Sequence, residues 1–271
     1  IVANTIFSMN VLSLYFALWV TVDKGGRDIL YGAALSGSMF VVALSVPVLG
    51  AISDHTGWRR KPLALLTFLC CAATALMGLA DDLYTGLVLF IVANYCYQAS
   101  MVFYNSMLPD VAKNSNIGLV SGYGVALGYI GSIAGLLVVK PLVLEGGRLA
   151  AFLPTAVMFL VFALPCLLFI KDPIIKNPSP LSLKNAFTSI RTTFREAQHY
   201  KHLLKFICIH FLVLDVANTI IAFVSIYANK VIGFDDEEIN SFMILATLAA
   251  MVGSFAIGWC TKIAGSQKSY W

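Results

Sequence analysis

The chain has 271 residues, of which 59% are hydrophobic and only 12% are charged, and its mean hydropathy is +0.83. A soluble domain is excluded, because its surface needs more polar residues than this composition supplies. The net charge of +4 is small and gives no reason to expect a nucleic-acid partner.

Eight apolar runs of about 20 residues follow one another along the chain. A helix of that length crosses a hydrocarbon core of about 30 Å. The runs are continuous rather than alternating, which favours helices over the strands of a membrane barrel. The sequence therefore predicts an all-α polytopic membrane protein with spans at 1–22, 29–52, 62–80, 84–105, 119–143, 149–170, 204–228 and 239–260.

The first span opens with Val-Ala-Asn-Thr-Ile at 2–6, and the same five residues return at 216–220 inside the seventh span. This repeat indicates a duplicated membrane domain and places Asn4 and Asn218 at equivalent positions of paired helices. Internal duplication with a binding site between the copies is typical of secondary transporters. A second echo lies at an offset of 208, where Gly50, Ser53, Asp54, Gly57 and Arg60 fall on Gly258, Thr261, Lys262, Gly265 and Lys268.

The Lys and Arg residues are concentrated in the even-numbered connections, with their flanks. The loops after spans 2, 4, 6 and 8 contain 13 of the 18. By the positive-inside rule we expect these loops to be cytoplasmic and the chain to start on the cytoplasmic side.

The domain organisation follows from the sharpest change in composition, at 171–202. We expect a six-helix domain at 1–170, a cytoplasmic linker with an amphipathic helix at 171–202, and the first two helices of a second domain at 203–271. Both ends look cut, because Ile1 corresponds to Asp215 well inside span 7 and the second copy stops after two spans.

The loop after span 2 reads Gly50-Ala-Ile-Ser-Asp54-His-Thr-Gly57-Trp-Arg-Arg60-Lys61. Glycines permit the tight reversal and the basic residues suit the headgroup region. The spacing resembles the signature loop of the major facilitator superfamily, and its weaker echo follows span 8, with Lys262 in place of Asp54. The resemblance implies a gate loop, which we expect to include Gly50, Asp54, Gly57, Arg59, Arg60 and Lys61.

A narrower resemblance lies at 103–112, Phe-Tyr-Asn-Ser-Met-Leu-Pro-Asp-Val-Ala, followed by a glycine-rich fifth span. It is similar to the vacuole effluxer (autophagy-related amino-acid effluxer) family and its bacterial relatives. The pattern Asp-x-Ala-Asn-Thr of that family matches Asp215, Asn218 and Thr219. This resemblance implies export of small solutes, including amino acids.

Asp215 is the ionisable residue near the middle of span 7, with Asn218 and Thr219 on the same helix face. An ionised carboxylate inside a bilayer is costly unless it faces a partner or water. We expect a proton or cation coupling site or a ligand for an amine. The structural alternative is a hydrogen bond that holds the bundle together.

Span 4 carries Asn94, Gln98 and Asn105 at helical spacing, and span 1 carries Asn4 and Ser8 one turn apart. Such amides bond neighbouring helices or line a cavity. In the superfamily that the chain resembles, spans 1, 4 and 7 line the central cavity, so we expect these residues, with Asp215, Asn218 and Thr219, to form the substrate and coupling cavity.

The sequence therefore predicts a secondary transporter working by alternating access, with a sugar–cation symporter as the alternative and a non-transporting receptor or scaffold as the rival class. No Walker loop, nucleophile elbow or metal-binding motif occurs, so we expect neither an enzyme nor an ATP-driven pump. We expect no cofactor beyond a proton or cation, and a monomer in a bacterial inner membrane, or in a vacuolar membrane if the source is eukaryotic.

Overall fold

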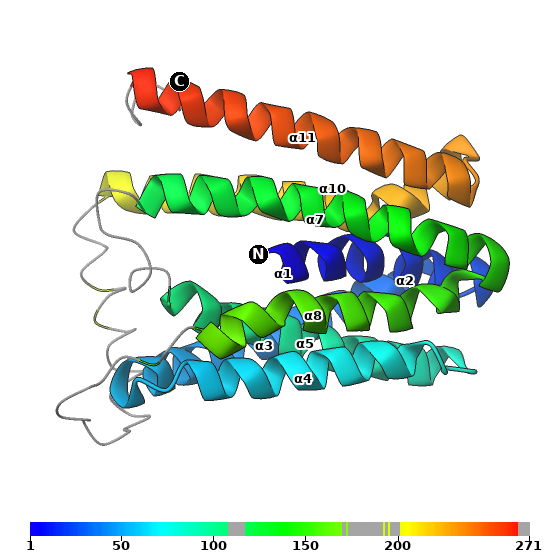
Figure 1. The fold of residues 1–271 in the computed structure, drawn as a ribbon, viewed down its shortest axis with the longest axis horizontal. Coiled ribbons are helices and arrows are strands. Elements are labelled where there is room, and N and C mark those ends of the chain that lie inside the picture. The colour runs from blue at the N-terminus through cyan, green and yellow to red at the C-terminus, as the bar shows by residue number, and fades with distance from the viewer. Residues whose placement is uncertain (108–116, 170–171, 173–191, 193–194, 196–200, 265–271) are drawn as a thin grey trace.

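The computed structural model describes residues 1–107, 117–169, 172, 192, 195 and 201–264, and these form helices joined by short turns (Figure 1). Within these described residues, eight helical spans are long and apolar enough to cross a membrane, and each matches a predicted span. The elements are α1 (Val2–Phe7), η1 (Ser8–Tyr15), α2 (Phe16–Leu18), η2 (Trp19–Asp23), α3 (Asp28–Thr56), α4 (Arg60–Met77), α5 (Leu83–Ser106), α7 (Ile117–Gly146), η3 (Arg148–Ala151), α8 (Phe152–Phe169), α10 (Lys201–Tyr227), η4 (Ala228–Ile232) and α11 (Asp236–Ala264).

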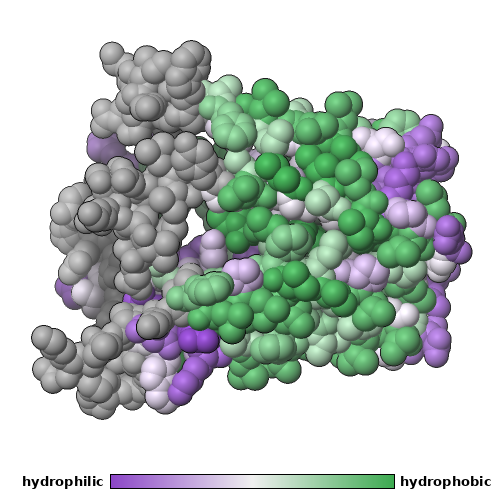
Figure 2. Space-filling model, viewed as in Figure 1, coloured by the Kyte–Doolittle hydropathy of each residue, from purple (hydrophilic) through white to green (hydrophobic). Residues whose placement is uncertain are grey.

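The helices form a bundle with an apolar belt and polar ends. Figure 2 shows hydrophobic side chains over the middle of the visible face and hydrophilic ones at its right-hand end. We call the end with the loop between α3 and α4 the basic-loop end, on the left of Figure 1, and the other the opposite end. An all-α, multi-pass membrane protein is thus confirmed. Which end faces the cytoplasm stays a prediction.

Span 1, which comprises α1, η1, α2 and η2, lies at the centre of the first six spans. In its most apolar window 78% of the residues are buried, against 6% for the window of span 7. Its rings form the core, with Phe16 stacked on Phe90 of α5 at 4.3 Å and Phe7 against Tyr97 at 4.8 Å. Both η1 and η2 are π-helical, a wider turn that is frequent at functional sites.

The glycines of span 5 pack against the start of span 1. A Cβ atom on Gly131 would lie 2.6 Å from Val2 Cγ1, and one on Gly128 would lie 3.0 Å from Thr5 Cγ2. The Thr5 hydroxyl donates to the Gly128 carbonyl at 2.8 Å. Small residues therefore let these two helices approach closely, as their spacing predicts.

Several predicted features lie outside the described residues. These are most of the linker at 171–202, the second half (108–112) of the run at 103–112, and the last part of the loop echo, at 265–268. The side chains of Asp54 and of 257–264 also lie outside them, although the backbone there is helical. The domain boundaries accordingly stay predictions.

Candidate functional site

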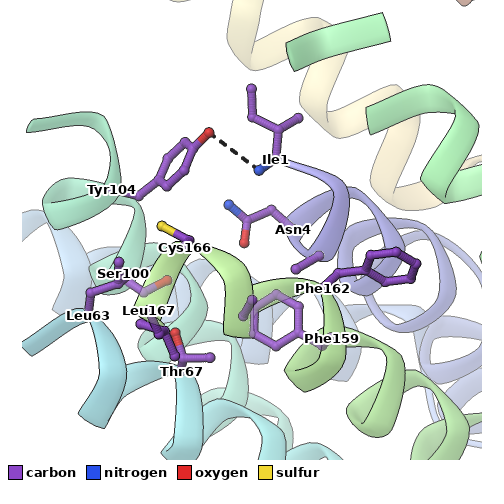
Figure 3. Close-up of a pocket in the computed structure, with 12 residues that line it drawn as sticks. Ile1, Asn4, Leu63, Thr67, Ser100, Tyr104, Phe159, Phe162, Cys166 and Leu167 are labelled. Atoms are coloured by element: carbon purple, nitrogen blue, oxygen red, sulfur yellow. Dashed lines mark hydrogen bonds between the residues drawn. The ribbon is translucent and has the colours of Figure 1, made fainter. Parts of the chain in front are cut away.

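Asn4 lines a small cavity between α1, α4, α5 and α8 (Figure 3). Its Nδ2 donates to Sδ of Met101 at 2.7 Å, and Tyr104 and Cys166 lie on the other sides of the same space. The volume, about 40 Å³, holds water rather than a substrate, since one water needs about 10–15 Å³ by this measure. In this conformation Asn4 therefore faces a pocket of water-sized volume inside the first six spans.

Ser8 of span 1 and Asn94 of span 4 also bond within the first six spans. Ser8 bonds Tyr97 of α5, one turn from the Asn4–Met101 contact. Asn94 is fully buried and its Nδ2 donates to Oγ of Ser38 at 2.6 Å. In this conformation these side chains bond neighbouring helices of their own unit.

The remaining predicted site residues are more open. Gln98 is half-buried, and Asn105 is exposed near the basic-loop end of α5. Asp215, Asn218 and Thr219 are exposed on α10. Within the described part of the chain, no group of three or more His, Cys, Asp or Glu could hold a metal ion together.

The predicted gate loop joins α3 to α4 and also contacts α5. Gly57 has φ +67° and ends α3, with its N–H bonded to the Ser53 carbonyl at 3.1 Å. The guanidinium of Arg59 donates to the carbonyl of Ser106, the last residue of α5, at 2.7 Å. Lys61 lies over the ring of Trp58, 5.0 Å from its centroid. Gly50 lies two turns before the end of α3, where an added Cβ would meet nothing.

Asp172 caps the start of α4 from the segment that follows α8. Its Oδ1 accepts from the backbone N–H of Arg59 at 3.0 Å and of Arg60 at 2.7 Å. A carboxylate at a helix N-terminus also complements the helix dipole. Sequence reasoning missed Asp172, which could have been found as the first acid after span 6.

Span 1 and span 7 end in the same way at the opposite end. After η2, Gly25 has φ +60°, and the next N–H bonds the Val20 carbonyl at 2.8 Å. After η4, Gly233 has φ +87°, and the next N–H bonds the Ala228 carbonyl at 3.0 Å. The two glycines and the two carbonyls are both 208 positions apart, the offset of the loop echo.

Two contacts between the copies involve residues that are related to each other by the same offset of 208. Tyr15 of span 1 and Asn240 of span 8 share hydrogen bonds, with Nδ2 2.9 Å from the phenolic oxygen. In the reciprocal crossing, Phe223 of span 7 lies 3.3 Å from the position of a Cβ on Gly32 of span 2. Adding 208 to Tyr15 gives Phe223, and adding 208 to Gly32 gives Asn240. A pseudo-two-fold axis therefore relates spans 1 and 2 to spans 7 and 8.

This register corrects the pairing of Asn4 with Asn218. At an offset of 208 the equivalent of Asn218 is Asn10, and Asn4 lies six residues, about 9 Å, nearer the basic-loop end. Asn10 is fully buried and donates to the Thr155 hydroxyl at 3.1 Å. The five-residue repeat gave a wrong alignment because span 1 has six more residues between the repeat and its final glycine, Gly25, than span 7 has before Gly233. The loop echo already carried the correct offset.

The same register pairs Asp215 with Phe7 rather than with Ile1. Phe7 faces the interior of its own unit, where its ring contacts Tyr97 and Phe159. The equivalent face of α10 therefore points away from the first six spans. The exposure of Asp215 agrees with this orientation.

Comparison with known proteins is consistent with this architecture. The family model described as Major Facilitator Superfamily matches residues 1–271. An uncharacterized protein of Aquifex aeolicus is 30% identical over 95% of this chain and 63% of its own length. The uncharacterized MFS-type transporter YxiO of Bacillus subtilis is 25% identical over 94% of the chain and 64% of its own length.

A fungal protein extends the comparison. Autophagy-related protein 22-1 of Penicillium rubens is 23% identical over 92% of this chain and 57% of its own length. No solved structure matches the chain. The chain thus spans less than two thirds of these relatives. The family model, the eight helical spans and the two-fold relation of spans 1–2 and 7–8 agree that the chain belongs to the major facilitator superfamily.

Proposed function

We propose that the protein moves a small solute across a membrane as a secondary transporter, by opening a central site to one side and then to the other. The observation that carries the proposal is the pair of reciprocal crossings, Tyr15 with Asn240 and Phe223 with Gly32. Two copies related by an axis through the bundle can rock about such contacts while the fold of each copy is kept.

The burial of the second copy supports this mechanism, because its contacts gather at the opposite end. The buried residues of α10 are Ala222, Ser225 and Ile226, in its last turns. Along 205–221 every residue of α10 is exposed. Among the described side chains of α11, at 236–256, the buried ones likewise lie between Ile239 and Thr247, near its start. Among the described side chains, the two copies thus meet at the opposite end, while α10 is exposed toward the basic loops, as one half of an alternating-access cycle requires.

The substrate we infer is a small polar solute such as an amino acid, and the direction is export. The support for both is the resemblance of the run at 103–112 to the vacuole effluxers and the similarity to the fungal autophagy-related protein. Amide and hydroxyl groups along spans 1 and 4 suit such a ligand by hydrogen bonding.

Asp215 is assigned to proton or cation coupling. It lies near the middle of the apolar span Leu204–Ile232, where an ionised carboxylate is costly without a partner or water. Because its helix face points away from the first six spans, we place its role inside the second copy. Binding or release of a cation there would change the cost of keeping that charge inside the membrane.

The experiment is a counterflow assay on proteoliposomes containing the full-length protein, with labelled amino acids and labelled sugars as separate probes. We expect exchange of amino acids and none of sugars. Asp215→Asn should reduce uptake driven by an ion gradient about tenfold or more while leaving counterflow measurable, because exchange needs no net coupling. Asp81→Asn is the matched control, since Asp81 is exposed in the loop before α5.

Three outcomes would count against parts of this proposal. Exchange of sugars alone would favour the symporter alternative over amino-acid export. Unchanged gradient-driven uptake in Asp215→Asn would remove the coupling role. Absence of flux for every probe, with Asp215→Asn disrupting assembly with a partner protein, would support a receptor or scaffold in place of a transporter.

A further inference from the structure

Arg148 connects the two copies at the opposite end of the bundle. It is the first residue of η3, the 3-10 turn between α7 and α8. Its Nη2 and Nε donate to the two carboxylate oxygens of Asp236, at 2.7 and 3.1 Å, and its Nη1 donates to Asp23. Asp23 ends span 1 and Asp236 begins α11, so one guanidinium bonds both copies.

Burial separates this contact from the other ion pairs between the copies. The Arg148 side chain is 10% exposed and that of Asp236 25%. In Lys140–Glu237 the exposed fractions are 22% and 64%, and in Lys230–Asp28 they are 37% and 49%. Exposed pairs contribute little, whereas losing one partner of a buried, hydrogen-bonded pair is costly.

Removal of the Arg148 guanidinium would not only abolish an attraction at this contact but would leave a repulsion between two carboxylates in its place. Asp23 and Asp236 lie close enough for their like charges to act on one another. Without the guanidinium, the exposed carboxylate of Asp23 and the half-buried one of Asp236 would repel each other across the contact. One helical turn farther along α11, Asn240 bonds both the Asp236 carbonyl, at 3.1 Å, and Tyr15. A displacement of Asp236 would therefore reach the crossing contact itself.

We propose that Arg148 is the latch residue of this end: it positions spans 1 and 8 against each other and holds the pathway closed there. The proposal rests on the proposed transport function, because a latch has a task only in a protein that opens at both ends in turn. Opening at the opposite end requires Asp236 to leave the guanidinium. Lys140 and Lys230, with exposed partners, add little to the closed state.

The test is a measurement of access that does not depend on transport. Ser225 is fully buried in the part of α10 that packs on span 1, and its hydroxyl has no hydrogen-bond partner among the described residues. Ser225→Cys, with the six native cysteines replaced by alanine, provides a thiol that only opening exposes. A maleimide that cannot cross membranes is added to each side of vesicles containing the full-length protein.

We expect Arg148→Ala to raise the labelling rate of this thiol from one side only, by about tenfold. Lys140→Ala, the matched control, should leave the rate within about twofold of the parent. Exchange of the charges, Arg148→Asp with Asp236→Arg, keeps two acids and one guanidinium in the contact and should restore slow labelling. Arg148→Ala should also lower counterflow, because the state open toward the basic loops is lost.

Each of the following results would overturn the proposal that Arg148 is a latch. Equal labelling in Arg148→Ala and the parent shows that the pair does not hold this end closed, and an equal rise in Lys140→Ala removes the special role of Arg148. If the exchanged pair labels as fast as Arg148→Ala, or neither variant folds, Arg148 acts by packing. The transport proposal fails separately, through absence of flux in a parent whose labelling still responds to Arg148→Ala.

Discussion

The contact between Trp19 and Gly86 offers a test of how tightly span 1 is held at the opposite end. Trp19 begins η2 and is 2% exposed. Gly86 lies in the first turn of α5, and a Cβ atom placed on it would lie 2.5 Å from Cη2 of the indole and closer still to Cζ3. The indole is stacked on Phe16 at 5.7 Å, so it cannot turn aside freely.

Gly86→Ala should therefore destabilise the protein although alanine favours helices. Insertion of a methyl group into a packed core costs about 1–3 kcal/mol. The replacement of a helical glycine by alanine contributes about 1 kcal/mol in the other direction. The net loss in free energy of unfolding is then up to about 2 kcal/mol, or roughly 4–8 °C in melting temperature at about 2–4 °C per kcal/mol.

Gly37→Ala is the matched control, because Gly37 is also inside a helix, α3, and nothing lies within 4 Å of its added Cβ. It should gain up to about 1 kcal/mol. The measurement is thermal unfolding of both variants in the same detergent, followed by tryptophan fluorescence at constant protein concentration. Equal stabilisation of the two variants would refute the reasoning, since it would show that the indole does not cover Gly86. Trp19→Phe should partly rescue Gly86→Ala, giving a coupling energy of opposite sign to the single losses.

Two further variants test polar groups. Asn10→Leu should be as stable as the parent or more stable by up to about 2 kcal/mol, because its Oδ1 has no hydrogen-bond partner among the described residues and Thr155 keeps its bond to the Ala151 carbonyl at 2.7 Å. Thermal unfolding beside the parent checks this, and an Asn10→Leu variant clearly less stable than the parent would show that the amide oxygen has a partner such as an ordered water. Asp82 caps α5, and hydrogen bonds from the Thr85 side chain and backbone hold the pKa of its carboxyl below the ordinary value of 3.8. Because that pKa is lower in the folded state, the cap stabilises the protein above pH 3.8 and its contribution is lost as the pH falls through the lowered pKa. Asp82→Ala should thus melt below the parent at neutral pH and with it in strong acid, whereas a gap that persists in acid would contradict a charged cap.

The spans could be predicted from the sequence because length and hydropathy alone decide whether a helix can cross a bilayer. The glycine face of span 5 was equally predictable, since only small residues allow the approach seen at Gly131. The repeat was harder to place. The five identical residues at 2–6 and 216–220 suggested one alignment of the copies, and the weaker loop echo suggested another, with an offset of 208. The hydrogen bonds after Gly25 and Gly233 agree with the offset of 208. Identity over five positions constrains a helix face, whereas a chain reversal constrains position along the axis.

Bonding partners were the least predictable part of the site. Helical spacing placed Asn4 and Asn94 on protein-facing sides, but not which neighbour each would meet, and both bond within the first six spans. No motif in the sequence marked Arg148 as functional, because it is an isolated basic residue in a short loop. It entered only the count of Lys and Arg residues in the odd-numbered, less basic loops. Its importance depends on two acids that are 88 and 125 positions away.

The two copies align with one offset but carry different side chains at equivalent positions. This difference bears on how the proposed transport cycle could be driven. One crossing is a hydrogen bond between Tyr15 and Asn240, and the other is an apolar contact between Phe223 and Gly32. Asp215 corresponds to Phe7, so at this position the second copy carries a charge and the first does not. The latch at Arg148 belongs to the first. A cation that binds at Asp215 therefore acts on span 7, which ends at the contacts of α10 with span 1, while Arg148 resists opening from the other copy. Under the proposed mechanism, coupling then requires only that occupancy of Asp215 shifts the balance against the ion pair that Arg148 forms with Asp236.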